Sequence, residues 1–159
     1  MREIKFRVYD DAKRKIYKVH RLDLENQEVV FYEDDFLPFP TVFKRNFKQV
    51  ILMQYTGLKD KNNKEIYEGD ILKCTLGCSQ MDQREHDVNA IVIFSKTGYG
   101  SAIGFTGKHL SGGIFALPCE NALEVIGNIY ENPDLVETRR ALWVIMVLDQ
   151  NIVKNAVKD

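Results

Sequence analysis

The sequence predicts an all-β fold of short strands joined by polar turns. Near the N-terminus, apolar and charged residues alternate from Ile4 to Val8, which is the period of a strand with one buried face. Later runs rich in Val, Ile, Tyr and Phe are separated by Gly, Asn and Asp, the residues that favour turns. Only after Asn132 does the apolar spacing change to that of a helix.

Residues 1–49 are expected to form an N-terminal β meander. Polar turns separate three runs of β-branched and aromatic residues, which predicts strands over residues 4–9, 16–22 and 27–32. Two prolines then indicate a loop over residues 34–41. Residues 42–49 have no decisive period, so their structure stays open.

The stretch from Leu52 to Cys74 has the most distinctive pattern in the chain, with strands joined by two polar turns. The apolar strand that begins at Val50 runs into a glycine, where positive φ would let the chain leave the sheet without strain. The tip of the next turn is an asparagine, a residue that tolerates the left-handed conformation well. Four positions are therefore predicted to be structural turn residues: Gly57, Asn63, Gly69 and Asp70.

Further strands are expected after this corner. The sequence Thr97-Gly98-Tyr99-Gly100 predicts a hairpin turn between two of them. Apolar runs predict four strands, over residues 88–94, 102–105, 114–117 and 123–129.

Three blocks of sequence, in the order MREIKFRVYD, QYTGLKDKNNKEIYEGDIL and EVIGNIYENPDL, resemble the YopX family of phage and prophage proteins. The resemblance implies a small, mostly β fold with an SH3-like, partly open barrel, and it implies no established activity. It suggests a β domain over residues 1–133, with the meander in residues 1–49 and the barrel in residues 50–133. Tyr9 and Asn63 depart from the family pattern, and residues 134–159 extend beyond its usual end.

The extension is predicted to be a helical tail. Asn132 and Pro133 suit the N-cap and first position of a helix, and the following apolar residues recur at helical spacing, which predicts a helix from about Pro133 to Val157. The run from Ala141 to Leu148 is also compatible with an added strand. As a helix it is apolar all round, so either a groove of the barrel buries it or a second copy covers it around Trp143.

Composition limits the classes of partner and compartment. The 159 residues suit one domain, and 22 basic against 23 acidic residues give a net charge of -1, without global attraction to nucleic acid or lipid. An odd set of cysteines and an N-terminus without an apolar leader favour reduced thiols in a cytoplasm. The resemblance to phage and prophage proteins implies that this is the cytoplasm of a host cell. The longest apolar run is too short to cross a membrane.

One local charge pattern could form a binding surface. Residues 1–20 hold seven basic and three acidic residues, whereas residues 21–40 hold one basic and six acidic residues. If the two segments pair, their charges offset each other; if they face apart, a basic aromatic surface remains that could stack single-stranded bases. The candidate surface consists of basic and aromatic residues of the first segment: Arg7, Tyr9, Lys13, Arg14, Lys15 and Tyr17.

Cysteine and histidine spacing gives no convincing site. Cys74, Cys78, His86 and Cys119 could be assembled into a zinc site, but they lack a paired CxxC framework. A nucleophile built from Cys78, His86 and Asp87 would lie on one polar loop with nothing visible to support it. We therefore expect no metal, no cofactor and no catalytic residue.

The acidic residues of the central stretch are better explained as turn residues. The segment 60–71 is similar to the start of a calcium loop, but Lys64 places a cation where a ligand belongs. Glu68 and Asp70 could act as paired carboxylates, yet carboxylates in turns usually bond nearby backbone amides.

These patterns favour a non-catalytic accessory protein that binds a phage or host protein, with possible self-association through the tail. The alternative is a weak binder of single-stranded nucleic acid, and a third hypothesis is an unrecognised hydrolase. Steep salt dependence of binding is typical of the nucleic-acid binder, and a convergent polar cluster in a deep pocket is typical of the hydrolase.

Overall fold

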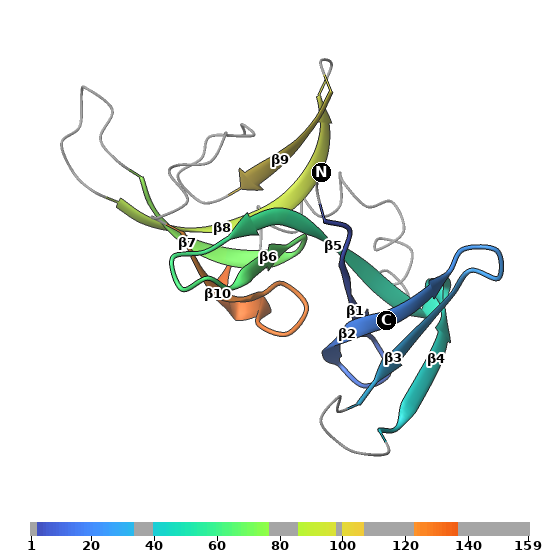
Figure 1. The fold of residues 1–159 in the computed structure, drawn as a ribbon. Coiled ribbons are helices and arrows are strands. Elements are labelled where there is room, and N and C mark those ends of the chain that lie inside the picture. The colour runs from blue at the N-terminus through green and yellow to red at the C-terminus, as the bar shows by residue number, and fades with distance from the viewer. Residues whose placement is uncertain (1–2, 34–39, 77–85, 98–99, 107–122, 137–159) are drawn as a thin grey trace, which may run out of the picture. The chain divides into compact units, whose positions relative to one another are not determined.

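The computed structural model describes residues 3–33, 40–76, 86–97, 100–106 and 123–136 (Figure 1). Within these ranges the chain forms ten β-strands and two 3-10 helices and no α-helix, so the all-β prediction is confirmed for them. The chain divides into two compact units, Met1–Gly57 and Leu58–Asp159. The division falls inside a strand, eight residues beyond the expected boundary after residue 49.

The first unit is built on an antiparallel sheet with the strand order β4-β3-β2-β1-β5 (Figure 1). The predicted three-stranded meander is present, and the ambiguous segment after it forms a fourth strand and a 3-10 helix, η1, capped by Asn46 and Gln49. The elements are β1 (Phe6–Asp10), β2 (Lys15–Asp23), β3 (Glu28–Tyr32), β4 (Val42–Asn46), η1 (Phe47–Gln49) and β5 (Val50–Lys59).

Two tight turns fix this meander. Between β1 and β2, the Asp10 side chain accepts a hydrogen bond from the Ala12 amide at 3.0 Å, and Arg14 takes a positive φ of 52°. Between β2 and β3, the Asp23 side chain accepts hydrogen bonds from the amide and the side chain of Asn26. Both turns use a short acidic side chain to satisfy the backbone, as turn chemistry predicts.

The core of the first unit lies on one face of its sheet. Alternation along the strands brings five buried residues to this face: Val8, Tyr17, Val29, Phe31 and Val50. Half-buried Phe43 and Phe47 pack against them from β4 and η1. Aromatic rings contribute to this small core from three neighbouring strands, and large rings bury much surface per residue.

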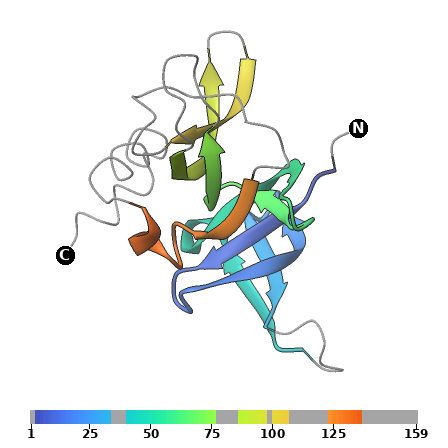
Figure 2. The same cartoon turned by 90° about the vertical axis from the view of Figure 1, so that its left-hand side faces the viewer.

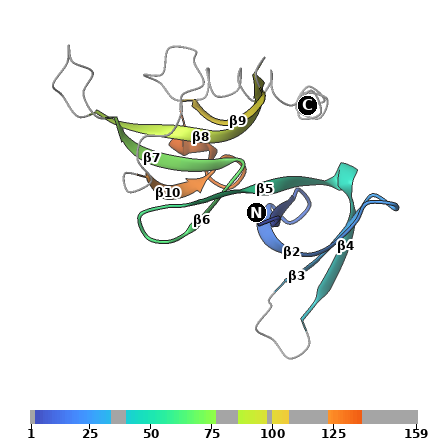
Figure 3. The same ribbon diagram turned by 45° about the horizontal axis from the view of Figure 1, so that its top comes forward.

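The second unit holds a four-stranded antiparallel sheet in the order β10-β7-β8-β9 (Figures 2 and 3). Its core consists of Ile66, Leu72, Ala90, Val92 and Leu123. In the strand order, β6 neighbours β5, whose last two residues belong to this unit. The elements are β6 (Glu65–Tyr67), β7 (Asp70–Leu76), β8 (His86–Thr97), β9 (Gly100–Thr106), β10 (Leu123–Asn128) and a 3-10 helix, η3 (Pro133–Leu135).

Two expectations about the architecture need correction. The described strands form two open sheets and do not close into one barrel over residues 50–133. The expected helix does not start at Pro133, because η3 is a 3-10 helix that ends with extended Val136 (φ -122°). The Asn132 side chain makes no cap bond to η3 and instead accepts a hydrogen bond from the Asn128 amide. The remaining tail and the predicted strand over residues 114–117 lie outside the described residues.

Candidate functional site

The structure separates the residues of the expected basic aromatic surface. In the β1–β2 register Val8 faces Tyr17, so Arg7 and Tyr9 project from the opposite face of the sheet. The rings are also enclosed, with exposed fractions of 7% for Tyr9 and 6% for Tyr17. Neither ring therefore offers an open face to a nucleic-acid base.

Three cations instead converge on an aromatic cluster at one end of the first unit. Lys13 Nζ lies 5.1 Å from the centre of the Phe43 ring, and Arg45 Cζ lies 5.5 Å from the same ring. Lys15 Nζ lies 5.5 Å from the centre of the Tyr17 ring. We call Lys13, Lys15 and Arg45 the cationic cluster. Such cation–π contacts hold flexible side chains near one position.

The rings beneath these cations form a packed support. The Tyr17 and Phe31 rings stack with their centroids 4.9 Å apart, and Phe43 lies 6.1 Å from Tyr17 and 5.5 Å from Phe31. Because three neighbouring strands supply one ring each, cross-strand packing fixes the position of every ring. The cationic cluster therefore rests on a rigid base.

Acidic residues compensate only part of this positive charge. Arg45 Nε lies 3.2 Å from Oδ2 of Asp10, which is fully buried, and the contact is an ion pair without hydrogen-bond geometry. Among the described residues, no ion pair involves Lys13 or Lys15. Burial raises the pKa of Tyr17, as do the nearby charges of Glu33 and Asp10, whereas Arg45 opposes the rise. The phenol is thus neutral and adds no negative charge beside the cationic cluster.

Three of the predicted turn residues have the positive φ that their sequence favours, but Gly57 lies inside β5, so the strand does not end at this glycine as expected. Positive φ occurs at Gly57 (89°), Asn63 (65°) and Gly69 (80°). A Cβ at Gly69 would also lie 3.2 Å from Cε2 of Tyr130, so space as well as φ favours glycine there.

Asp60, the first residue of the segment that resembles a calcium loop, anchors the turn before β6, as the turn interpretation of that segment expects. Its Oδ1 accepts hydrogen bonds from the amides of Asn62 at 2.8 Å and Lys64 at 2.9 Å, and its Oδ2 accepts one from the Val125 amide at 3.0 Å. Burial alone would raise the pKa of Asp60, but the three amides and the Lys64 charge lower it. Asp60 therefore stays ionised and joins the turn to β10.

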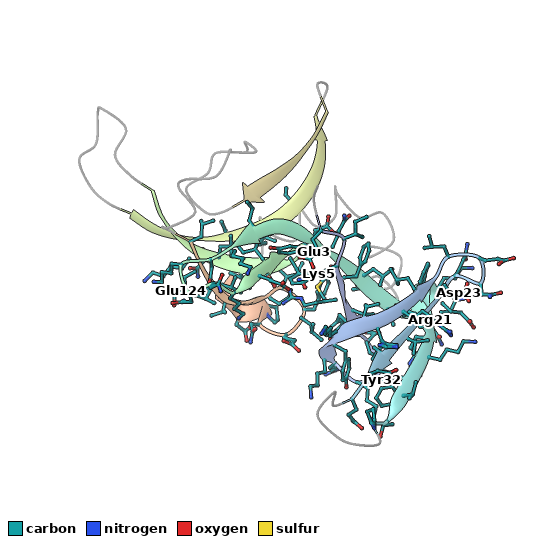
Figure 4. The ribbon with its side chains drawn as sticks, in the orientation of Figure 1. Glu3, Lys5, Arg21, Asp23, Tyr32 and Glu124 are labelled. Atoms are coloured by element: carbon teal, nitrogen blue, oxygen red, sulfur yellow. The ribbon has the colours of Figure 1, made fainter. Side chains whose placement is uncertain are left out.

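Backbone contacts beside Asp60 cover the outer edge of β10. The Lys61 amide donates to the Leu123 carbonyl at 2.9 Å, and the Lys61 ammonium pairs with Glu124 at 2.6 Å. Figure 4 shows Glu124 at this side of the second unit. An uncovered edge strand would present free amides and carbonyls to other chains. The central turn thus has an architectural role at the edge of this sheet.

Asp70 makes the second connection between the two distinctive stretches of sequence. Its Oδ2 accepts a hydrogen bond from the Tyr67 amide at 2.8 Å, and its Oδ1 accepts one from the Asn128 side chain at 3.1 Å. The Asn128 side chain also accepts a hydrogen bond from the Tyr130 amide at 3.0 Å. A carboxylate held in this way is a structural group, as the turn interpretation of Asp70 expects.

The ranges that the structure describes contain no group of three or more metal-ligating side chains. The Cys78 and Cys119 parts of the alternative zinc and nucleophile sites lie outside those ranges. Within the same ranges, no helix has the length and apolar character to cross a membrane.

Comparison with known proteins identifies the family of this chain. The model of the family described as YopX protein matches residues 5–137, which is most of the chain. The chain therefore belongs to the YopX family. A search of curated proteins finds no match.

One solved structure supports the fold. The crystal structure of protein EF1440 from Enterococcus faecalis aligns with a TM-score of 0.55 and 24% sequence identity. The alignment covers 86% of this chain and 100% of that chain. At this identity the likeness concerns the fold alone.

The residues that sequence analysis missed are those whose role depends on partners distant in the sequence. Phe43 and Arg45 lie in the segment without a clear period, and they join Lys13 only because β4 packs near the β1–β2 turn. Asn128 gave no signal of its own, although it lies in a block that resembles the family. That block could have suggested a contact with the central stretch.

Proposed function

We propose that this protein is a non-catalytic binding module whose cationic cluster contacts an acidic segment of a partner protein. The observation that carries the proposal is the convergence of Lys13 and Arg45 on one ring, with Lys15 beside it on Tyr17. Together these side chains concentrate positive charge beside the two rings, and carboxylates of a partner would be attracted to it.

A protein partner suits the surface better than a nucleic acid. Binding of single strands relies on aromatic faces that stack successive bases, and Tyr9 and Tyr17 are buried. The Phe43 ring already has two cations beside it. A few carboxylates match three cations more closely than a continuous phosphate backbone does.

The wider setting of the proposal follows from membership of the YopX family. We place the protein among phage or prophage products that act in the cytoplasm of a host cell, with a phage or host protein as the partner. The order β4-β3-β2-β1-β5, with η1 between β4 and β5, supports an SH3-like arrangement of the first unit. The first unit, Met1–Gly57, would then be the binding module, because it holds all three residues of the cationic cluster.

A direct binding measurement tests the proposal. Fluorescently labelled peptides rich in Glu, a Lys-rich peptide of equal length and a single-stranded DNA oligonucleotide would be titrated with the full-length protein at several salt concentrations. We expect binding of the Glu-rich peptides and a roughly tenfold loss of affinity in the double variant Lys13→Glu/Lys15→Glu, since each exchange turns an attraction into a repulsion.

The matched control is Lys48→Glu/Lys59→Glu, which changes the charge by the same amount at two exposed lysines outside the cluster. Equal losses in both double variants would show a non-specific effect of net charge and overturn the proposal. Binding of DNA without binding of acidic peptide would favour the nucleic-acid alternative instead. Failure to bind every probe would also reject the proposed surface.

A further inference from the structure

The edge of β4 beside the cationic cluster has unpaired backbone positions. The Glu33 amide donates to the Thr41 carbonyl at 3.0 Å, and the Phe47 amide donates to the Gln27 carbonyl at 2.8 Å. These bonds fix the phase of the antiparallel β3–β4 ladder, in which alternate residues of β4 point their backbone groups toward β3.

By this phase, Val42 and Lys44 point their amides and carbonyls away from β3. Two contacts agree with the assignment, because the Lys44 carbonyl accepts a hydrogen bond from its neighbour Arg45 at 3.2 Å and the Asn46 amide donates to Gln49. Among the residues that the structure describes, no strand lies beyond β4 in the sheet (Figure 1). The available edge is therefore short and consists of the amide and carbonyl of Val42 and the amide of Lys44, because Arg45 already bonds the Lys44 carbonyl.

The two faces next to this edge differ in chemistry. On the core face, Phe43 and Arg45 lie with Lys13, which makes that side cationic. On the opposite face, Val42 is 59% exposed and pairs across the strands with Tyr32, which Figure 4 shows beside this edge. The Tyr32 ring in turn contacts the His20 ring with centroids 4.6 Å apart, so Val42 at the edge continues into a pair of rings on this face.

We propose that the acidic segment of the partner binds as an added β-strand along β4, with acidic and apolar side chains in alternation. Side chains of a strand alternate between the two faces of a sheet, so its carboxylates would lie beside Arg45 and Lys13 and its apolar side chains beside Val42 and Tyr32. This inference rests on the proposed function and adds the partner's conformation and its sequence pattern.

A protective role of Lys44 against unwanted strand pairing does not explain the two different faces beside the β4 edge. A lysine on an edge strand commonly prevents unwanted pairing, and the Lys44 ammonium pairs with Glu28 at 2.6 Å. Prevention of unwanted strand pairing does not require an exposed valine on one face of the edge and a cationic aromatic surface on the other. Cations on one face and Val42 on the other match a partner segment in which acidic and apolar residues alternate.

Two peptides of identical composition test the inference, one with strictly alternating Glu and Val and one with the Glu and Val residues in separate blocks. We expect the alternating peptide to bind full-length protein at least roughly tenfold more tightly, because only it can present carboxylates to one face. Equal affinity of the two peptides would overturn strand addition.

The variant Lys44→Pro tests the edge directly, since proline removes an amide that points away from β3 and is tolerated on edge strands. We expect a loss of affinity of roughly tenfold or more for the alternating peptide. The control is Leu24→Pro, which places proline in the exposed turn between β2 and β3. Similar losses in both proline variants would mean that the edge is not the site.

Hydrogen exchange of backbone amides in the wild-type protein tests the inference even if the Lys44→Pro variant does not fold. In the wild-type protein, the alternating peptide should slow exchange of the Val42 and Lys44 amides, and unchanged exchange in the bound state would reject strand addition. The two proposals fail differently. If Lys13→Glu/Lys15→Glu weakens binding but Lys44→Pro does not, the binding module stands and the added strand falls; if no acidic peptide binds, both fall.

Discussion

Asn128 donates a side-chain hydrogen bond to Asp70 at 3.1 Å, across 58 positions of the sequence. Both residues are buried, at 3% and 1% exposure. Each belongs to one of the two most distinctive blocks of the chain, and the bond links the first residue of β7 to the last residue of β10, which are register partners. The two blocks are thus in direct contact within the second unit.

The first prediction concerns this bond. Asn128→Ala removes the donor to Asp70 and the acceptor for the Tyr130 amide, and it should lower the free energy of unfolding by about 1–3 kcal/mol, the typical cost of losing a buried hydrogen bond. Urea unfolding followed by far-UV circular dichroism measures the change. Asn62→Ala, at an exposed turn position, is the control, and equal effects would contradict a special role for Asn128.

The second prediction concerns pH and Asp60. The amides of Val125, Lys64 and Asn62 lower the pKa of Asp60 despite the opposing effect of burial. A carboxyl whose folded pKa lies below its unfolded value, about 3.9, stabilises the fold above that value and loses this contribution as the pH falls through the folded pKa. Exchange of the Lys64 amide should therefore accelerate as the pH is lowered below about 4, beyond the intrinsic change in exchange rate.

Asp60→Asn is the variant that isolates this effect. The asparagine side chain keeps one carbonyl acceptor, but its NH2 group would face a backbone amide donor. The variant should therefore be less stable than the wild type at neutral pH by about 1–3 kcal/mol. The protection of its Lys64 amide should change less between pH 5 and pH 3 than in the wild type. A variant with the same acid sensitivity as the wild type would show that another carboxyl is responsible.

The third prediction concerns Gly57, which has a φ of 89° and an exposed position. Gly57→Val should destabilise the protein by about 1–3 kcal/mol through backbone strain, because a β-branched residue rarely adopts this conformation. Asn63→Gly is the comparison, since glycine accepts the φ of 65° at that turn without strain. An unchanged melting curve for Gly57→Val would contradict the strain argument.

Local turn chemistry explains which features could be predicted from sequence. Positive φ at Gly57 and Asn63 follows from residue type alone, and the alternation from Phe6 to Val8 defines a strand. The grouping of Lys13 with Phe43 and Arg45 required knowledge of β4, whose short segment gives no period. Alternation also placed Tyr9 and Tyr17 on opposite faces, an outcome that a count of charges and rings over residues 1–20 cannot reveal.

The fourth prediction concerns the C-terminal tail, which we propose also mediates self-association. Residues 142–148 are consecutively apolar, and Trp143 is the residue best suited to anchor a contact between two copies. The full-length chain should sediment as a dimer or larger, and truncation after Pro133 should give a folded β protein that is monomeric. A full-length protein that remains monomeric at high concentration would contradict self-association.

The last prediction concerns Asp10 and Arg45 in the first unit. Asp10 is fully buried, and Arg45 Nε lies 3.2 Å from its Oδ2 while its Oδ1 accepts a hydrogen bond from the Ala12 amide. Arg45→Met should lower the free energy of unfolding by about 3–5 kcal/mol, because it leaves a buried carboxylate without its compensating charge.

The double variant Asp10→Asn/Arg45→Met separates charge compensation from simple loss of packing. It removes the carboxylate charge as well and keeps an oxygen that can accept the Ala12 hydrogen bond, so it should recover part of the lost stability. Urea unfolding of the wild type, both single variants and the double variant gives the coupling between the two residues. If the losses of the single variants simply add in the double variant, the ion pair contributes no coupling and the effect of Arg45→Met arises from its packing on Phe43.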